Sequence, residues 1–356
     1  MFLPDMVTGA DGTTGTANIA PPLPLVLPPP APLVLRTDAS IAAQPKLRCA
    51  TRDGTAAEAR AAAAKVAKAA GTSGGVFVNV HWTVVHDGAA GNLSRSDIEA
   101  QVRHLNAAWG GVADAWSAPG WQVAWRPQME RPAGVFFTLT GVQYRDDAGF
   151  FASCSPTTGP AWSAAHNVDT AHTMNVYSCL PSDNLLGWTS FPSDMANETD
   201  GAAAAVFVRH DTLPGVSSDD AFGLGNTLVH EAGHYFGLYH VFQGATCSSD
   251  PAAGDGVADT TPQRSPTYGS CAANREKSSC PPAVDGVTNY MDYSDDACMR
   301  VFTPQQIQLI HETVREYRPS LYDNVSPCPR TRRRTRRVAA GEPCAAPPIL
   351  LEAQCC

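Results

Sequence analysis

The sequence predicts a fold that mixes β-strands and α-helices, and three segments support this prediction. VFVNVHWTVVH (residues 76–86) places every second residue on one apolar face, as a half-buried strand does. SDIEAQVRHLNAAW (96–109) spaces its apolar residues as one stripe of an amphipathic helix. LVHEAGHYFGLYH (228–240) adds three histidines and a glutamate to a helical apolar pattern, so the search for function begins there.

The composition indicates a globular, loop-rich protein with an acidic balance. The 356 residues are 44% apolar and 17% charged, and the formal net charge is −9. Nucleic acid binds basic surfaces, so an acidic chain is a poor partner for it. The stretch nearest to a membrane span, residues 21–35, is broken by prolines and cannot form a continuous helix. We therefore expect neither nucleic-acid binding nor a membrane span, and the oligomeric state stays open.

Local signals also predict the remaining elements of the folded centre. Capping boxes at Thr55–Glu58 and Ser96–Glu99 predict the starts of two helices, the first ending at Gly71. Further strands are expected at residues 135–144, 173–179 and 202–210. A closing helix is expected at 303–318, where Thr303 and Gln306 form another capping box. Residues 110–134 and 244–295 read as irregular. The Pro- and Ala-rich residues 1–45 are expected to be disordered, and the Arg- and Cys-containing residues 321–356 to form a tail.

The spacing of the histidines predicts a metal site. His230 and His234 are four residues apart, which on a helix puts both imidazoles on one face. Gly237 can end the helix and turn the chain, so that His240 returns as a third ligand. Three histidines with one open position are typical of catalytic zinc, whereas structural zinc has four protein ligands. A surface helix with chance histidines is the alternative, and the full HExxHxxGxxH spacing argues against it.

Other segments carry a resemblance to a known family. HEAGHYFGLYHVFQG, GDGVADTTP, NYMDYSDDACM followed by FTPQQ, and the upstream GNLSRSDIEAQVRHLN and LLGWTSFP resemble the pappalysin family of metzincin metalloproteases, in its secreted fungal and bacterial branch. The resemblance covers roughly residues 49–318. Residues 113–134 look inserted relative to the family pattern, and the arginine-rich tail is unfamiliar.

The resemblance implies a fold and a set of roles. The fold would be an α+β metzincin (zincin-like) catalytic domain: a twisted mixed sheet, an active-site helix and an irregular, disulfide-pinned lower subdomain. One Zn²⁺ would be held by the three histidines, with Glu231 as general base and then acid. Met291 would form the supporting turn, and Tyr293 would donate to the tetrahedral intermediate. An ordinary core methionine and a buried aromatic are the alternatives for these last two residues.

The implied function is that of a zinc-dependent endopeptidase. It would hydrolyse peptide bonds of proteins through a zinc-bound water, with a preference for basic residues at the cleaved bond. Two rivals are weighed against it. A zinc hydrolase acting on another amide is disfavoured by Met291 and Tyr293, and a catalytically weak pappalysin-like binding module is disfavoured because Glu231 is retained.

The eleven cysteines favour an oxidising, extracellular location, although the N-terminus shows no ordinary signal peptide. Spacing alone leaves three pairings open for the four cysteines of the loop-rich region, and the resemblance implies Cys247–Cys280 and Cys271–Cys298. A structural zinc there is disfavoured because no CxxC pair occurs. Cys154 and Cys179 are candidates for a third bridge. The four cysteines of the tail, Cys328, Cys344, Cys355 and Cys356, stay unassigned.

The odd cysteine count leaves at least one thiol without an intrachain partner, and Cys49 in LRCATRDG is the candidate. In similar proteases a prosegment cysteine blocks the zinc, and a thiolate is a good fourth ligand. Residues 46–74 would then be a propeptide and 75–320 the catalytic domain. A disulfide to the tail and an idle thiol are the alternatives. Asp255 and Asp259 in GDGVADTTP fit either a calcium site or a plain turn.

Overall fold

The computed structural model describes residues 46–69, 75–110 and 133–323, apart from Glu198, Ala203, Ser218 and Asp220. The predictions for residues 1–45, for most of the segment 113–134 and for the tail from residue 324 onwards lie outside the described residues. No helix in the described part is long and apolar enough to cross a membrane.

A five-stranded mixed sheet forms the centre, and a mixed sheet is what the resemblance implied, although the fifth strand, β4, was not among those predicted. The spatial order of the strands is β2-β1-β3-β5-β4. The pairs β1–β2, β1–β3 and β3–β5 are parallel, and the edge strand β4 runs antiparallel to β5. The strands are β1 (Val76–His86), β2 (Val135–Asp146), β3 (Thr173–Cys179), β4 (Gly187–Thr189) and β5 (Ala205–Arg209). The strand predicted at 202–210 is therefore shorter at both ends.

Helices of very different length surround the sheet. The long ones are α1 (Ala56–Lys68), α2 (Arg95–Trp109), α5 (Asn226–Tyr235) and α7 (Pro304–Tyr317). The short ones are α3 (Ala148–Ser153), α4 (Gly159–His166), α6 (Cys271–Asn274) and α8 (Ser320–Asp323). The capping boxes predicted at Thr55 and at Thr303 are both present.

Two predicted helix ends were wrong. Helix α2 is capped by Ser94 and Asp97 rather than by Ser96 and Glu99, because the Ser94 hydroxyl accepts from the Asp97 backbone N–H (3.2 Å) while the Asp97 carboxylate accepts from the Ser94 N–H (2.8 Å). An aspartate completes this box as well as a glutamate does. Helix α1 ends at Lys68, before Gly71, because Ala69 already has extended backbone angles.

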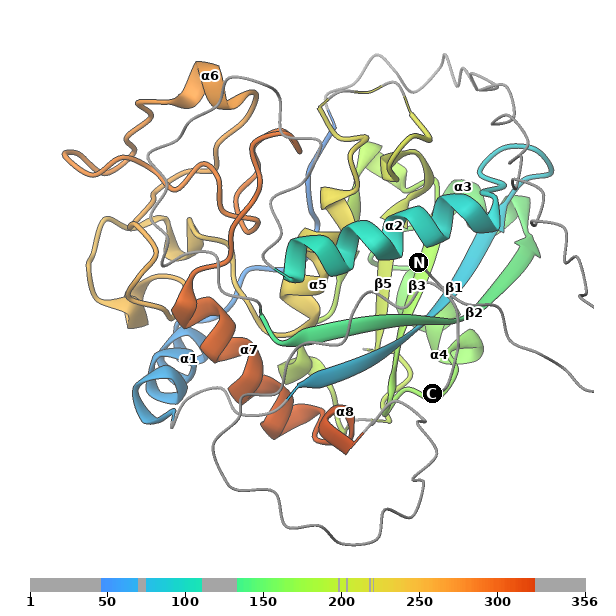
Figure 1. Cartoon of the computed structure of the whole chain (residues 1–356), viewed down its shortest axis with the longest axis horizontal. Helices are drawn as coiled ribbons and strands as arrows, with labels where there is room; N and C mark the ends of the chain where they lie inside the picture. Colours follow the sequence, from blue (N-terminus) through green and yellow to red (C-terminus); the bar gives the residue numbers. More distant parts are fainter. Residues whose placement is uncertain are drawn as a thin grey trace, which may run out of the picture. The chain divides into compact units, whose positions relative to one another are not determined.

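Apolar cores cover both faces of the sheet. The alternating residues of β1, from Val76 to Val84, are fully buried in the larger core, which they share with apolar residues of α2, α5 and α7. A smaller core contains Phe150 and Phe151 of α3 together with Trp188 of β4 and Phe207 of β5. Figure 1 shows α2 crossing the sheet and α1 lying beside α7, and α5 packs against β4 and β5. The active-site segment is thus packed between the sheet and the loop-rich region.

Candidate metal centre

Helix α5 and the turn after it position the three histidines. Every residue of α5 is buried. Gly237 then takes a left-handed backbone conformation (φ 93°), which a residue with a side chain rarely adopts, and the helix ends. His240 follows in a buried position and faces the two histidines of the helix.

The Nε2 atoms of these histidines converge. His234 Nε2 lies 3.1 Å from His230 Nε2 and 3.0 Å from His240 Nε2. The thiol of Cys49 joins them, so that one ligand atom from each of the four residues lies within 4.8 Å of all the others. Among the described residues, these four form the group of metal-ligating side chains that lie close enough together to hold one metal ion.

The protonation of the rings shows that this donor set suits a cation. The Nδ1–H of His230 donates to the carbonyl oxygen of Tyr290 (2.6 Å), and that of His234 donates to the carbonyl oxygen of Leu238 (2.7 Å). Burial holds the pKa of both imidazoles well below its usual range, so both are neutral. Their Nε2 lone pairs then point at each other, and lone pairs at this distance repel unless a cation lies between them. The residues therefore fit Zn²⁺, which imidazole binds well.

Glu231 lies next to the cluster with little room around it. A Cβ at position 187 would come within 2.9 Å of the Glu231 side chain, so glycine there lets the edge strand β4 pass close by. One carboxylate oxygen, Oε2, accepts from the Thr51 hydroxyl (3.0 Å), and Oε1 is buried without a hydrogen bond. Burial raises the pKa of Glu231 to about 8. Without a cation nearby, burial therefore favours the protonated carboxyl group over the carboxylate.

Met291 and Tyr293 both lie close to the three histidines. Met291 is fully buried under α5, where a Cβ on Gly233 would be 2.4 Å from its sulfur. The Tyr293 hydroxyl is 3.1 Å from His240 Nε2, and burial raises the pKa of the phenol, which keeps its proton. Between them, the Asp292 carboxylate accepts from the backbone N–H of Tyr293 and of Thr267, each at 2.8 Å.

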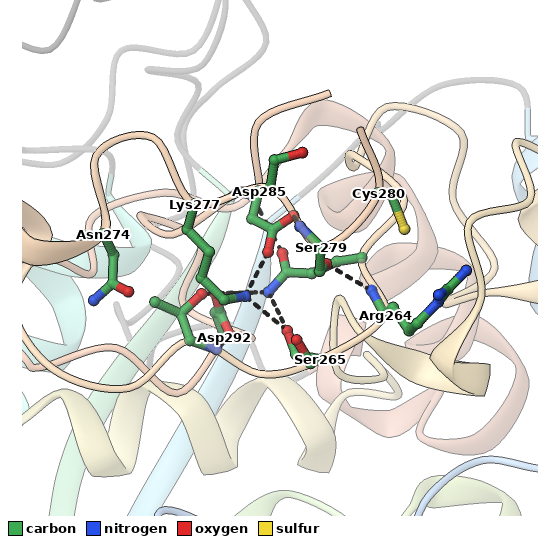
Figure 2. A network of polar contacts seen from close by, with 12 residues as sticks. Arg264, Ser265, Asn274, Lys277, Ser279, Cys280, Asp285 and Asp292 are labelled. Carbon is green, nitrogen blue, oxygen red and sulfur yellow. Dashed lines mark hydrogen bonds and ion pairs between the residues drawn. The ribbon is translucent and has the colours of Figure 1, made fainter. Parts of the chain in front are cut away.

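The loop-rich region holds this turn from outside. Figure 2 shows Lys277 between the Asp285 carboxylate and the backbone oxygen of Ser265. Gln263 connects the turn at Asp292 with the segment at Asp285. Its amide N–H donates to Asp292 (2.9 Å), and its amide oxygen accepts from the Gly286 N–H (3.2 Å). The turn that carries Tyr293 is therefore fixed by a polar network rather than by regular secondary structure.

Residues 46–54 lie across the cluster. The backbone of Leu47 pairs with Asn184 and Leu186, and the N–H of Ala50 donates to the oxygen of Gly187 (3.1 Å), so this segment extends along the β4 edge of the sheet. Cys49 is the one described cysteine without a disulfide, and its sulfur is 3.5 Å from Glu231 Oε2. Burial raises the pKa of its thiol well above the usual range, with the Glu231 charge adding to the effect.

Two arginines flank Cys49 and bind acidic residues of the catalytic part. Arg48 is buried and pairs with the fully buried Asp296 at 2.7 Å. The other oxygen of Asp296 accepts from the backbone N–H groups of Leu224 (3.0 Å) and Asn226 (3.2 Å), where α5 begins. Arg52 binds Asp194 at 2.5 Å nearer the surface.

Three disulfides pin the described chain. They join Cys154 to Cys179, Cys247 to Cys280 and Cys271 to Cys298, the pairs named in the sequence analysis. The last two lie in the loop-rich region.

The two aspartates of GDGVADTTP lie in different surroundings. Both oxygens of Asp259 are engaged, with the Thr303 hydroxyl (2.6 Å) and the Gln305 N–H (2.8 Å) at the start of α7. Asp255 is 5% exposed, and its Oδ2 makes no hydrogen bond. This carboxylate lines a cavity of about 70 Å³ together with Thr246, Asp250 and Thr261. Burial raises its pKa to about 7.

Sequence reasoning missed Thr51, Gly187 and Asp296. Each of them reaches a predicted site residue, or the neighbour of one, through a contact between segments that are far apart in the sequence. Two features of the sequence could have indicated the Arg48–Asp296 ion pair. Arg48 lies next to Cys49, and Asp296 belongs to the aspartate pair in YSDDACM.

Comparisons with known proteins agree with this geometry. The sequence profile of the Peptidase M43 family, described as pregnancy-associated plasma protein-A, matches residues 163–315. An extracellular metalloprotease of Pyricularia oryzae is 35% identical over 258 residues, which is 70% of this chain and 78% of the relative. One from Arthroderma benhamiae is 30% identical over 251 residues, 69% of this chain and 75% of the relative.

Solved structures with a similar fold come from Tannerella forsythia. Mature mirolysin in complex with a cleaved peptide matches with a TM-score of 0.60 and 23% identity, over 72% of this chain and all of that one. A point mutant of promirolysin matches with a TM-score of 0.61 and 22% identity, over 76% of this chain and 91% of that one.

Proposed function

Because the chain belongs to the pregnancy-associated plasma protein-A family of metallopeptidases, the pappalysins, we propose a specific mechanism for its action as a zinc-dependent endopeptidase on proteins or peptides. The observation that carries the proposal is the convergence of three imidazole lone pairs beside a buried glutamate. His230, His234 and His240 would hold the metal. Zinc, when bound, polarises a carbonyl group and lowers the pKa of water.

Glu231 acts as the general base and then as the acid. Its carboxylate takes the proton of the attacking water at Oε1, the oxygen without a hydrogen bond, and gives it to the leaving amine. Beside a bound zinc ion, the pKa that burial raises in Glu231 would fall, so that the carboxylate would be ionised near neutral pH and could accept the proton. The close approach of Gly187 restricts the carboxylate to this position.

Tyr293 stabilises the oxyanion. Its phenol keeps its proton, lies at the cluster, and is fixed through the backbone by Asp292. A neutral donor aimed at the reacting carbonyl strengthens as negative charge develops there. Met291 packs against α5 at Gly233 and takes no part in proton transfer.

Cys49 keeps the full chain latent. Its sulfur belongs to the four-residue cluster, and the segment that carries it occupies the edge of β4, which an extended substrate needs. A metal ion favours the thiolate over the thiol, which reverses the effect of burial on its pKa. Residues 46–74 would then be the propeptide and 75–320 the catalytic domain.

Asp296 gives the preference for a basic residue at the cleaved bond. In the full chain the buried Arg48 guanidinium satisfies it. Removing Arg48 with the propeptide leaves a buried carboxylate, which costs free energy until another cation pairs with it. A substrate arginine or lysine next to the scissile bond supplies that cation.

Calcium and secretion complete the proposal. The unpaired, buried oxygen of Asp255 beside other oxygen-bearing side chains supports a Ca²⁺ site there. Asp259 is engaged at α7 and is left out of this site. The relatives named as extracellular and the three disulfides support secretion.

The test compares the full chain with its Glu231→Gln variant. Both are produced under oxidising conditions, carry a specific protease site inserted at residues 70–74, and are cleaved there. Each receives a mixed peptide library with and without a chelator. We expect about one zinc per chain in both, and chelator-sensitive cleavage only with Glu231, the variant losing about 10²-fold or more. Cleavage by the zinc-loaded variant at the original rate would contradict the role of Glu231.

A further inference from the structure

A cavity of about 170 Å³ lies beside Ala50, the residue after Cys49. Arg52 lines it from the same segment, and the catalytic part supplies the rest of the wall. The carbon-rich part of that wall consists of Trp188, Phe207, Ala205, Pro156 and Pro160. None of these residues belongs to the metal cluster or contacts Arg48.

The cavity lies next to the cleavage machinery. The Ala50 N–H donates to the oxygen of Gly187, the residue whose backbone passes against Glu231. Along the propeptide, Arg48 and Ala50 flank Cys49, one reaching Asp296 and the other the cavity. A substrate extended along the same edge therefore meets the acidic pocket on one side of the cleaved bond and this cavity on the other.

The wall is rigid and shaped for an apolar group. The rings of Trp188 and Phe207 stack at 4.6 Å with an interplanar angle of 4°, and both are buried in the smaller core. The volume is close to that of a cavity known to hold benzene, about 150 Å³. The methyl group of Ala50 leaves most of this space unfilled.

We propose that this cavity is a specificity subsite for a leucine- or phenylalanine-sized apolar side chain of the substrate. It binds a substrate side chain on the opposite side of the scissile bond from the basic residue. The inference rests on the proposed peptidase function. After Arg52 leaves with the propeptide, Asp194 at the rim still accepts from the Phe191 N–H (3.1 Å) and is exposed to solvent, so the buried carbon walls decide the occupant.

The first arm of the test is a cleavage profile of the activated full chain. Large apolar residues should be preferred over alanine by about tenfold at one position opposite to the basic residue. Ala202→Trp, which fills the cavity from its wall, should abolish this preference and leave the basic preference intact. Ala196→Trp, at an exposed position outside the wall, is the control and should retain both. The proposal would be wrong if this position showed no residue preference or preferred basic residues. It would also be wrong if the Ala202→Trp variant kept the preference for large apolar residues.

The second arm needs no catalysis, so it stands even if the peptidase proposal fails. In the latent full chain, Ala50→Leu should fill the cavity and hold the propeptide more tightly. Alkylation of Cys49 by a maleimide, followed by mass spectrometry of its peptide, should slow by about tenfold. In an Ala202→Trp background the same change should bring no slowing. Equal effects in both backgrounds, or faster alkylation in Ala50→Leu, would mean that the cavity does not accept an apolar side chain.

Discussion

Two glycines decide where the side chains of Glu231 and Met291 can lie. Gly187 lets β4 approach Glu231, and Gly233 lets the sulfur of Met291 touch the active-site helix. The polar residues then follow from proximity: Thr51 holds one Glu231 oxygen, and the carbonyls of Tyr290 and Leu238 orient two of the imidazoles. These carbonyls fix the tautomer that leaves Nε2 free for a metal.

Asp296 offers the sharpest test of specificity at this scale. Asp296→Asn keeps an oxygen for the Leu224 and Asn226 N–H groups but removes the charge. We expect kcat/KM for arginine peptides to fall by about tenfold or more, about 1.4 kcal/mol, because the substrate cation loses its partner. Matched citrulline peptides should change little. Measuring both peptides on the activated enzyme gives the ratio.

The neighbouring Asp295→Asn variant is the control, since the Asp295 carboxylate is within reach of the Arg48 charge but makes no hydrogen bond or ion pair with it. Its peptide ratio should match that of the unmodified enzyme. An Asp296→Asn enzyme that still prefers arginine over citrulline by the original factor would rule out this carboxylate as the source of the preference.

Among the elements, α5 depends on the turn packed beneath it. The helix is entirely buried, and the turn at Met291 reaches it because Gly233 carries no side chain. The loop-rich region holds this turn in place, because Gln263 donates a hydrogen bond to Asp292, which accepts from the Tyr293 N–H. A region of little regular structure thus positions Tyr293, the proposed oxyanion donor.

Gly233→Ala tests this packing. In a free helix the change would stabilise, but here the new methyl group would lie 2.4 Å from the Met291 sulfur. We expect a net loss of about 1–3 kcal/mol in the free energy of unfolding, measured by urea titration. In a Met291→Ala background the same change should cost far less. An equal cost in both backgrounds would show that the contact does not limit the helix.

Calcium should stabilise the loop-rich region more at high pH. The folded-state pKa of Asp255, about 7, exceeds its unfolded value of about 3.9. The folded chain therefore loses stability as pH rises between these values, because the unfolded chain releases a proton that the folded carboxyl keeps; above about pH 7 a buried charge forms in the folded chain. Calcium offsets that charge only when the carboxylate is ionised. We expect calcium to raise the melting temperature more at pH 8 than at pH 5.5.

Two variants separate the aspartates of this region. Asp255→Asn should lose both the calcium effect and its pH dependence. Asp259→Asn should keep them, although it weakens the start of α7. A calcium effect that survives in Asp255→Asn, or that is the same at both pH values, would argue against the site.

For the molecule as a whole, local patterns were predictable and distant contacts were not. The strand β1 and the capping boxes at Thr55 and Thr303 could be predicted, because each depends on nearby residues. The mixed sheet was available only through the family resemblance. The Ser94 cap was missed because two serines in the same turn are equally good candidates.

The rest depends on chain segments far apart in the sequence. Arg48 meets Asp296 across 248 positions, and Thr51 meets Glu231 across 180. No periodicity or propensity encodes such pairs, since they exist only after the sheet and α5 have formed. The cavity beside Ala50 is of the same kind, because its walls come from α4, β4, β5 and the loops between them.

The central claim is that His230, His234 and His240 bind one zinc ion and that Cys49 completes its ligands in the full chain. X-ray absorption at the zinc edge measures this directly. We predict three nitrogen ligands and one sulfur at about 2.3 Å in the full chain. In Cys49→Ala the sulfur should disappear while the nitrogens and the zinc remain. A full chain without sulfur around its zinc, or a Cys49→Ala spectrum that still contains it, would contradict the account.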